Sequence, residues 1–364
     1  MVCRVLSGAV SFLALGVLVA QATPSGGAPP AAAPPATAPP AASRVVARTF
    51  PAMGTEVTFS AYTSDPDKAE RAFAAAYDEI RRVERLMTDW ERPGEPESDI
   101  VRINKAAGKK PVKVSAETIE VIEKSLDMSR RSDGAFDITF AAMHGLWKFD
   151  EDMDKSIPPA DEIAERRKLI NWRDVLVDVK AGTVKLRRAG MRMGLGGIAK
   201  GYGVDRSSAV LRAAGLENFM VQAGGDLFVA GRKGSANWMV GVRNPRGGPR
   251  DIIARMPIQD HAFSTAGDYE RGFVLNGRRY HHIIDPKTGY PATASREVTI
   301  FAPNAFLADA LDDSVFILGP KKGLELVESY PDCATLIVDA QNKVWMSKSL
   351  EGKLQRTAAP TDGI

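Results

Sequence analysis

The chain has 364 residues, 44% of them hydrophobic, and its 48 basic against 45 acidic side chains leave a formal net charge of only +3. This near balance gives no electrostatic case for a nucleic-acid partner. The composition is that of a globular protein with one large domain or two ordinary ones, and two cysteines, Cys3 and Cys333, exclude a framework of several disulfides.

The first 22 residues have the pattern of a secretory signal peptide, with Arg4, an apolar run and the small residues around Ala22. Retention of the run as a membrane anchor is the alternative. No cysteine follows the run closely, so a lipoprotein is not expected. Residues 23–43 form a Pro/Ala-rich linker that favours extended polyproline II. The rest is therefore expected to be exported, either periplasmic or associated with the outer side of the inner membrane.

A folded domain is expected over residues 44–355, with a disordered tail over 356–364. In chain order the sequence first predicts a strand pair over 45–63 around Met53-Gly54-Thr55, a helix over 65–88 capped by Asp65 and a helix over 115–132 capped by Ser115. A helix over 197–215, closed by Gly215, follows. The last predicted elements are strands over 219–231 and 296–303, a helix over 304–319 and a final strand pair over 334–347. Strict alternation of strand and helix is lacking, so the expected class is α+β, with mixed, largely antiparallel sheets and packed helices.

Glycines crowd the segment 193–205, "MGLGGIAKGYGVD", at the start of the third predicted helix. Such a loop lets the backbone approach a phosphate, the helix N-terminus offers free N–H groups, and Lys200 adds a cation. Gly194, Gly196 and Ala199 fit a dinucleotide fingerprint only loosely, because no clear βαβ unit surrounds them. Tight helix–sheet packing with an exposed lysine is the alternative interpretation.

Three aspartates follow one another on the helix predicted over 304–319, where Asp309 shares a face with both Asp312 and Asp313. Like charges at this spacing repel each other unless a cation lies between them. A hard divalent cation would supply it, and a solvated acidic helix start is the alternative.

Other polar residues lie in unusual surroundings. Asp137 stands among apolar neighbours and would need a buried partner. Thr265, Gly267 and Asp268 are expected in a tight turn. Trp90 opens a loop, where it serves either as a stacking platform or as an indole at the edge of the core.

Two of only four histidines, His281 and His282, stand side by side in "RRYHHIIDPKTGYPA", before a polar turn that begins at Asp285. With "MGTEV", "LMTDW", "GAFDIT", "LGGIAKGYGVD", "VQAGGDLFVAG", "STAGDYER" and "ADALDDSVFILG", this stretch resembles the ApbE family over residues 46–347. The resemblance implies an α+β fold and an exported FAD:protein FMN transferase. Such enzymes use a divalent metal, Mg²⁺ with Ca²⁺ or Mn²⁺ as alternatives, to move FMN from FAD to a Ser or Thr of an acceptor flavoprotein subunit and release AMP.

The same resemblance assigns roles by position. It implies catalytic roles for His282, Asp285 and Lys200, metal ligation by the Ala199 carbonyl, Asp309 and Asp313, and flavin binding by Met53, Gly54, Thr55, Trp90, Gly196, Gly197, Lys200, Gly225, Asp226, Thr265, Gly267, Asp268 and His282. His281 is the more expendable neighbour. Position 313 is usually Thr in the family, so metal choice and turnover stay open here. An FAD pyrophosphatase and a non-catalytic flavin-binding protein are the alternative functions, and an uncleaved N-terminus would add membrane association.

Overall fold

The computed structural model describes residues 42–149 and 152–363. These residues belong to one compact unit. The predicted signal peptide and all but the last two linker residues lie outside the described residues, so both stay predictions. No helix within the described ranges is long and apolar enough to cross a membrane.

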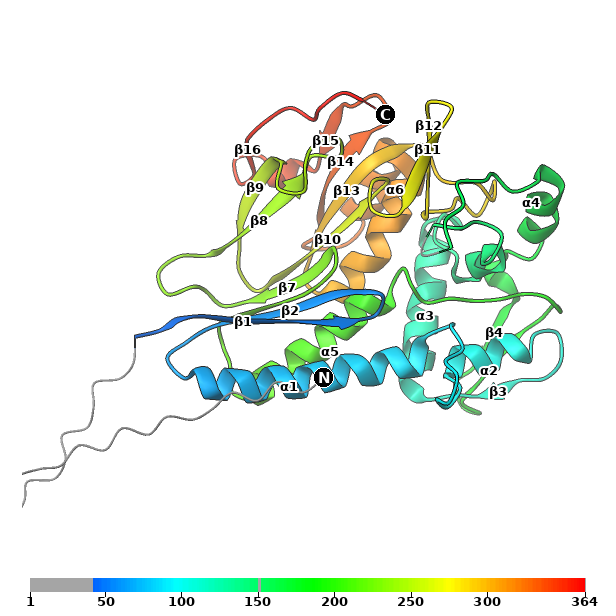
Figure 1. The fold of residues 1–364 in the computed structure, drawn as a ribbon, viewed down its shortest axis with the longest axis horizontal. Coiled ribbons are helices and arrows are strands. Elements are labelled where there is room, and N and C mark those ends of the chain that lie inside the picture. Colours follow the sequence, from blue (N-terminus) through cyan, green and yellow to red (C-terminus); the bar gives the residue numbers. More distant parts are fainter. Residues whose placement is uncertain (1–41, 150–151, 364) are drawn as a thin grey trace, which may run out of the picture. The chain divides into compact units, whose positions relative to one another are not determined.

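An eight-stranded sheet, antiparallel throughout, forms the centre of the fold (Figure 1). Its strands are, from edge to edge, β1 (Arg44–Ala52), β2 (Thr55–Thr63), β6 (Phe219–Ala223), β7 (Asp226–Ala230), β10 (His261–Gly267), β13 (Ser295–Ala302), β14 (Ala334–Asp339) and β15 (Val344–Met346). Smaller antiparallel sheets are made of β3 (Val112–Lys113), β5 (Thr183–Leu186) and β4 (Val175–Asp178); of β16 (Gln355–Arg356), β9 (Ile252–Ile258) and β8 (Trp238–Arg243); and of β11 (Gly272–Leu275) and β12 (Arg278–His281).

The described residues form six helices. They are α1 (Pro66–Met87), α2 (Asp99–Lys105), α3 (Ala116–Arg131), α4 (Ala160–Arg167), α5 (Ala199–Ala213) and α6 (Ala305–Glu328), with 3₁₀ turns η1 (Ile138–Met143), η2 (Trp172–Asp174) and η3 (Lys348–Leu350). α6 lies on β10, β13 and β14, while α5 packs between α6 and α1 and also against β6 and β7 (Figure 1). The α+β class is therefore confirmed.

Two hydrophobic cores follow from this layering. The larger one lies between the helices and the sheet and includes Phe59, Phe73 and Phe316. The second one lies on the other face, where Phe263 and Phe301 pack against residues of β8 and β9. Alternate side chains of one strand therefore enter different cores, as the pleat of a strand requires.

Several predicted helix starts are confirmed by their caps. Lys68 N donates to Asp65 Oδ1 over 2.9 Å, and Thr118 N donates to Ser115 Oγ over 3.0 Å. The helix predicted over 304–319 is interrupted at Gly319, which adopts φ 73° and ψ −178°, and a second helical stretch follows the kink as far as Glu328. The kink allows this continuation where proline normally ends a helix.

Three further stretches differ from the expectation. Residues 219–231 form a hairpin, β6 and β7, because Gly224 has φ +59° and turns the chain. Thr265 and Gly267 lie within β10, paired with β13, so the predicted tight turn is wrong for these two residues, whereas Asp268 does lie in the turn that follows the strand. In the tail expected to be disordered, Thr357 N donates to Ile253 O and Thr361 N to Asn244 Oδ1. These bonds hold the tail against the folded unit.

Candidate functional site

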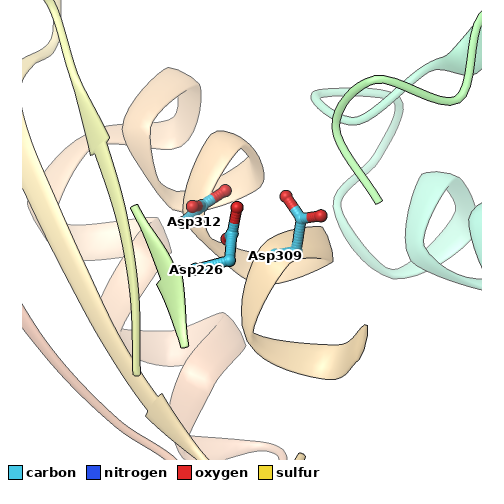
Figure 2. Close-up of side chains that lie close together, drawn as sticks. All are labelled: Asp226, Asp309 and Asp312. Atoms are coloured by element: carbon cyan, nitrogen blue, oxygen red, sulfur yellow. The ribbon is translucent and has the colours of Figure 1, made fainter. Parts of the chain in front are cut away.

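Three buried carboxylates from distant parts of the chain form the centre of the site (Figure 2). Asp226 is the first residue of β7, and Asp309 and Asp312 lie one turn apart on α6. Each offers an oxygen within 4.8 Å of the others, and the three residues are 1%, 1% and 4% exposed. We call Asp226, Asp309 and Asp312 the acidic group. Hard oxygen ligands in this number suit a divalent cation.

Lys200, in the first turn of α5, provides the positive charge at the acidic group. Its Nζ lies 2.7 Å from Asp226 Oδ2 and 3.1 Å from Asp309 Oδ1. Burial disfavours the ammonium, yet the carboxylates of Asp226 and Asp309 outweigh it and raise the pKa of Lys200 above its ordinary value. Lys200 therefore stays charged and is the counter-charge of the group.

The hydroxyl of Ser264 on β10 joins the other two carboxylates. Its Oγ lies 2.5 Å from Asp226 Oδ1 and 2.5 Å from Asp312 Oδ2. A hydroxyl has one proton to donate, so one of these two short contacts requires a protonated carboxyl. Burial, together with the charges of Asp313 and Asp309, raises the pKa of Asp312 well above its usual range. Asp312 is one of the two carboxyls that contact Ser264, and its raised pKa favours the protonated form.

Asp309 and Asp313 are also protonated more easily than free aspartates. Burial, and then the charge of Asp226, raises the pKa of Asp309 to about 7, against the opposing effect of Lys200. Burial raises the pKa of Asp313 to about 6. The Asp313 carboxylate faces Gly197, where a Cβ would lie 2.8 Å from its Oδ2. Asp313 is thus near the acidic group but is not one of its three members.

The glycine-rich loop brings α5 onto α6 at the acidic group. Gly201 N donates to Asp309 Oδ2 over 2.7 Å. A Cβ at Gly201 would lie 2.2 Å from Ala305 O, so only glycine permits the two helices to approach this closely. Ala199 and Lys200 open α5 beside this contact. Lys200 therefore contacts the acidic group, and the other predicted loop residues, Gly196, Gly197 and Ala199, stand within four positions before Lys200 in the sequence.

The two adjacent histidines have different surroundings. His281 is buried: its Nε2 donates to Ala292 O over 2.9 Å, while its Nδ1 accepts from Ile283 N, so it supports the fold. His282 follows β12, and its Nδ1 lies 3.4 Å from Arg271 O. Burial, and then the neighbouring His281 and Arg271, lowers the pKa of His282 to about 3, and the charge of Lys200 contributes too. His282 is therefore a neutral imidazole whose pKa the charge of Lys200 also lowers.

Met53 and Gly54 form the turn between β1 and β2, both with positive φ, 54° and 68°. Trp90 lies in the loop after α1 and is 63% exposed. Its indole stacks on the His144 ring, with centroids 5.9 Å apart and planes 15° apart, and His144 Nδ1 lies 2.9 Å from Asp89 Oδ2. Stacking on one face leaves most of the indole available to a planar ligand.

Other predicted residues form hydrogen bonds within the protein. Asp285 Oδ1 accepts from Lys287 N over 2.8 Å and so shapes its own turn. Asp268 forms two bonds with Arg246, of 2.6 and 2.8 Å, and Thr265 Oγ1 donates to Gly225 O over 3.1 Å. The same holds for Asp137, whose Oδ1 accepts from Thr139 and whose Oδ2 accepts from Trp172 N.

Comparisons with known proteins decide the family. A model of the ApbE family matches residues 53–337. The FAD:protein FMN transferase of Treponema pallidum (strain Nichols) is 33% identical over 276 residues, which are 71% of this chain and 75% of that protein. An FAD:protein FMN transferase of Klebsiella pneumoniae (strain 342) is 30% identical over 84% of this chain and 92% of its own length. The chain belongs to the ApbE family.

Solved ApbE structures share the fold. The crystal structure of the ApbE protein from Thermotoga maritima superposes with a TM-score of 0.76 at 31% identity and covers 86% of this chain and 100% of its own. The flavin transferase ApbE from Vibrio cholerae gives a TM-score of 0.75 at 25% identity, over 85% of this chain and 99% of its own. The resemblance expected from the motifs over residues 46–347 is confirmed.

Some residues of this ApbE site were not predicted in their observed roles. The helical spacing places Asp312 beside Asp309, but the choice of Asp313 as metal ligand followed the family position. Ser264 has no signal of its own beyond its place in "STAGDYER". His144 and Asp89 are 55 residues apart, and their contact depends on how η1 and the loop after α1 meet. A scarce histidine in an aromatic segment was the only available sign.

Proposed function

We propose that this protein is an FAD:protein FMN transferase, which moves FMN from FAD to a Ser or Thr hydroxyl of an acceptor protein and releases AMP. The observation that carries the proposal is the acidic group with Lys200, whose charge also acts on the neutral His282, in a chain that belongs to the ApbE family. The acceptor class is inferred from the family's reaction. The N-terminal signal pattern favours an acceptor outside the cytoplasm.

The donor set fits a divalent metal ion. Asp226, Asp309 and Asp312 would hold it, with Asp313 and the Ala199 carbonyl as further oxygen donors nearby. Within the described chain these four carboxylates face a single ammonium, Lys200, and burial, followed by the neighbouring carboxylates, raises the pKa values of Asp309, Asp312 and Asp313. We propose Mg²⁺, with Ca²⁺ and Mn²⁺ as alternatives, because hard oxygen ligands suit all three. Bound there, the metal would neutralise oxygens of the FAD pyrophosphate.

The protein's own residues then have simple tasks. One oxygen bridges the two phosphorus atoms of the FAD pyrophosphate. The bond from this oxygen to the FMN phosphorus breaks, and the FMN phosphorus forms a new bond to the acceptor oxygen. AMP leaves with the bridging oxygen. His282, neutral at physiological pH, would take the proton of the acceptor hydroxyl. Lys200 supplies positive charge beside the phosphates, and Met53, Gly54 and Trp90 would line the flavin ring.

The decisive experiment uses the chain from residue 23 onward, which keeps every described residue, with FAD, Mg²⁺ and an acceptor flavoprotein subunit. Intact acceptor mass and released AMP are followed together. A mass gain of one FMN with matching AMP establishes the transferase. AMP with free FMN and an unmodified acceptor makes it a pyrophosphatase, and bound FAD without AMP makes it a flavin-binding protein.

A matched pair of variants tests the metal assignment. Asp309→Asn should lower the transfer rate at least 100-fold, because it removes a charged ligand of the acidic group. Asp174→Asn changes another buried aspartate, 6% exposed against 1% for Asp309, which pairs with Arg187 and Arg188, and it should keep the rate within threefold. Equal rates in the two variants would remove Asp309 from the site.

A further inference from the structure

The Met53–Gly54 turn is held from two sides. Met53 adopts φ 54°, a left-handed conformation that side chains other than glycine rarely occupy. Its sulfur packs toward Gly203 of α5, where a Cβ would lie 3.2 Å from Met53 Sδ. A strained turn of this kind persists only where its surroundings hold it in place.

Glu84 of α1 holds the Met53 side of the turn. Its Oε1 accepts from Met53 N over 3.0 Å, and the same oxygen lies 2.6 Å from Arg92 Nη2. The Glu84 side chain is 11% exposed, so both bonds are largely shielded from water. Arg92 belongs to the loop that carries Trp90. One carboxylate oxygen therefore connects the turn with the Trp90 loop.

Arg271 holds the Gly54 side of the turn. Its Nη2 donates to Gly54 O over 2.9 Å. Its own carbonyl oxygen accepts from His282 N over 3.1 Å and lies 3.4 Å from His282 Nδ1. A carbonyl can only accept, so this contact places the ring proton on Nδ1 and leaves the Nε2 lone pair free. Arg271 thus connects the turn with the orientation and tautomer of His282.

We propose that Glu84 and Arg271 are positioning residues, which clamp the Met53–Gly54 turn so that the Trp90 loop and His282 form one connected unit. The inference rests on the proposed function, since it assigns the Trp90 loop to the flavin ring and His282 to the phosphate chemistry. Glu84 acts through Met53 and Arg92, and Arg271 acts through Gly54 and His282. The distance between the Trp90 loop, which would bind the flavin ring, and His282, which would take the proton, is thereby fixed in the protein before FAD binds.

Steady-state kinetics separate the two halves of the clamp. Glu84→Ala should raise the KM for FAD about tenfold and also lower kcat about fivefold, because it removes the bonds to Met53 N and to Arg92 and so releases both the turn and the Trp90 loop. Arg92→Ala should raise KM alone, and Arg271→Ala should lower kcat about tenfold with KM within threefold. Glu84→Gln keeps an oxygen that accepts from Met53 N and should stay within threefold of the wild type on both parameters.

Glu79 provides the matched control. It lies on the same helix, is 13% exposed and pairs with Arg82 and Arg206, but the structure gives it no bond to the turn. Glu79→Ala should leave KM and kcat within twofold. If Glu84→Ala behaves like Glu79→Ala, or if Glu84→Gln is as impaired as Glu84→Ala, the positioning role of Glu84 is wrong.

Imidazole ¹⁵N NMR tests the Arg271 half without FAD or acceptor. The chain has only four histidines, so the His282 signals can be assigned from a His282→Gln variant. The wild type should show protonated Nδ1 and free Nε2 on His282, and Arg271→Ala should shift these signals toward a tautomer mixture while His261 stays unchanged. Unchanged His282 signals would overturn the Arg271 role. An inactive wild type with the expected tautomer would instead count against the proposed function alone.

Discussion

At the scale of single residues, Asp312 and Asp313 show how neighbours on one helix take different tasks. Asp312 points to Ser264 and belongs to the acidic group, whereas Asp313 faces Gly197. The charge of Asp313 contributes to the raised pKa of Asp312. Asp313 therefore adds negative charge near the acidic group without being one of its three members.

Replacing Asp313 by Thr should keep or raise Mg²⁺-supported transfer, up to about fivefold. The change removes one of four carboxylates at the site and keeps an oxygen donor, so less charge opposes the anionic pyrophosphate. Transfer rates over a range of Mg²⁺ and Ca²⁺ concentrations measure the effect. A variant without activity would show that this site depends on the carboxylate.

The Trp90–His144 stack makes a second residue-scale prediction. His144→Ala removes the ring on which the indole rests and should weaken FAD binding about fivefold, or about 1 kcal/mol. His144→Phe keeps an aromatic surface and should recover most of the affinity. Fluorescence anisotropy of FAD measures both, with His261→Ala, at an exposed bond to Asp332 O, as control. Equal affinities in all variants would exclude a role for the stack.

At the scale of elements, α6 depends on a partner helix for its start. Asp205 of α5 accepts from Ala305 N and Phe306 N, both over 3.0 Å, and Asn304 accepts from Leu307 N. Burial raises the pKa of Asp205 to about 6, although these two bonds oppose the shift. The first turn of the helix that carries Asp309 is thus fixed by α5.

Asp205→Ala should therefore lower the free energy of unfolding by about 2–3 kcal/mol, because it leaves two partly buried N–H groups without an acceptor. Asp205→Asn keeps one acceptor and should cost about half as much. Asp67→Ala, an exposed first-turn position of α1, should cost less than about 0.5 kcal/mol. Urea unfolding followed by circular dichroism gives the three values, and similar losses at 205 and 67 would contradict the assignment.

Elements were predictable where local signals act, as the caps Asp65 and Ser115 show. Predictions failed where distant partners override local preference. "STAGD" has the composition of a turn, yet pairing with β13 keeps Thr265 and Gly267 extended. The acidic group could be predicted only in part, since Asp309 and Asp312 follow from helical spacing. Asp226 joins them only because β7 packs against α6 in the folded protein, and no local sequence pattern predicts this long-range contact.

At the scale of the whole molecule, a buried acid affects stability across the neutral pH range. Glu297 on β13 is 0% exposed, and its Oε1 accepts from Thr299 Oγ1 over 2.6 Å. Burial raises the pKa of Glu297 to about 8. The folded state therefore binds this proton more tightly than the unfolded state, so the stability it contributes is full below the ordinary pKa and is lost as pH rises toward 8.

Wild-type protein should thus lose up to about 4 kcal/mol of unfolding free energy between pH 5 and pH 8 through Glu297, and Glu297→Gln should abolish this part. The difference between the two proteins at each pH isolates Glu297 from Asp205, Asp309 and Asp313, which act in the same direction, and from His282, which acts in the opposite one. Urea unfolding at pH 5, 6.5 and 8 measures it, with exposed Glu56→Gln as control. If the unfolding free energies of the wild type and Glu297→Gln change with pH in parallel, Glu297 is ionised in the folded protein and the raised pKa is wrong.

The large sheet has one further consequence for how the chain assembles. Its strands lie side by side in the order in which they occur in the sequence, and each pairs antiparallel with the next sheet strand along the chain. As the chain is made from its N-terminus, every new strand can therefore join an open edge, and no strand has to enter between two that are already paired. The helices and smaller sheets are excursions from this growing edge, so the acidic group closes only when α6, between β13 and β14, is in place.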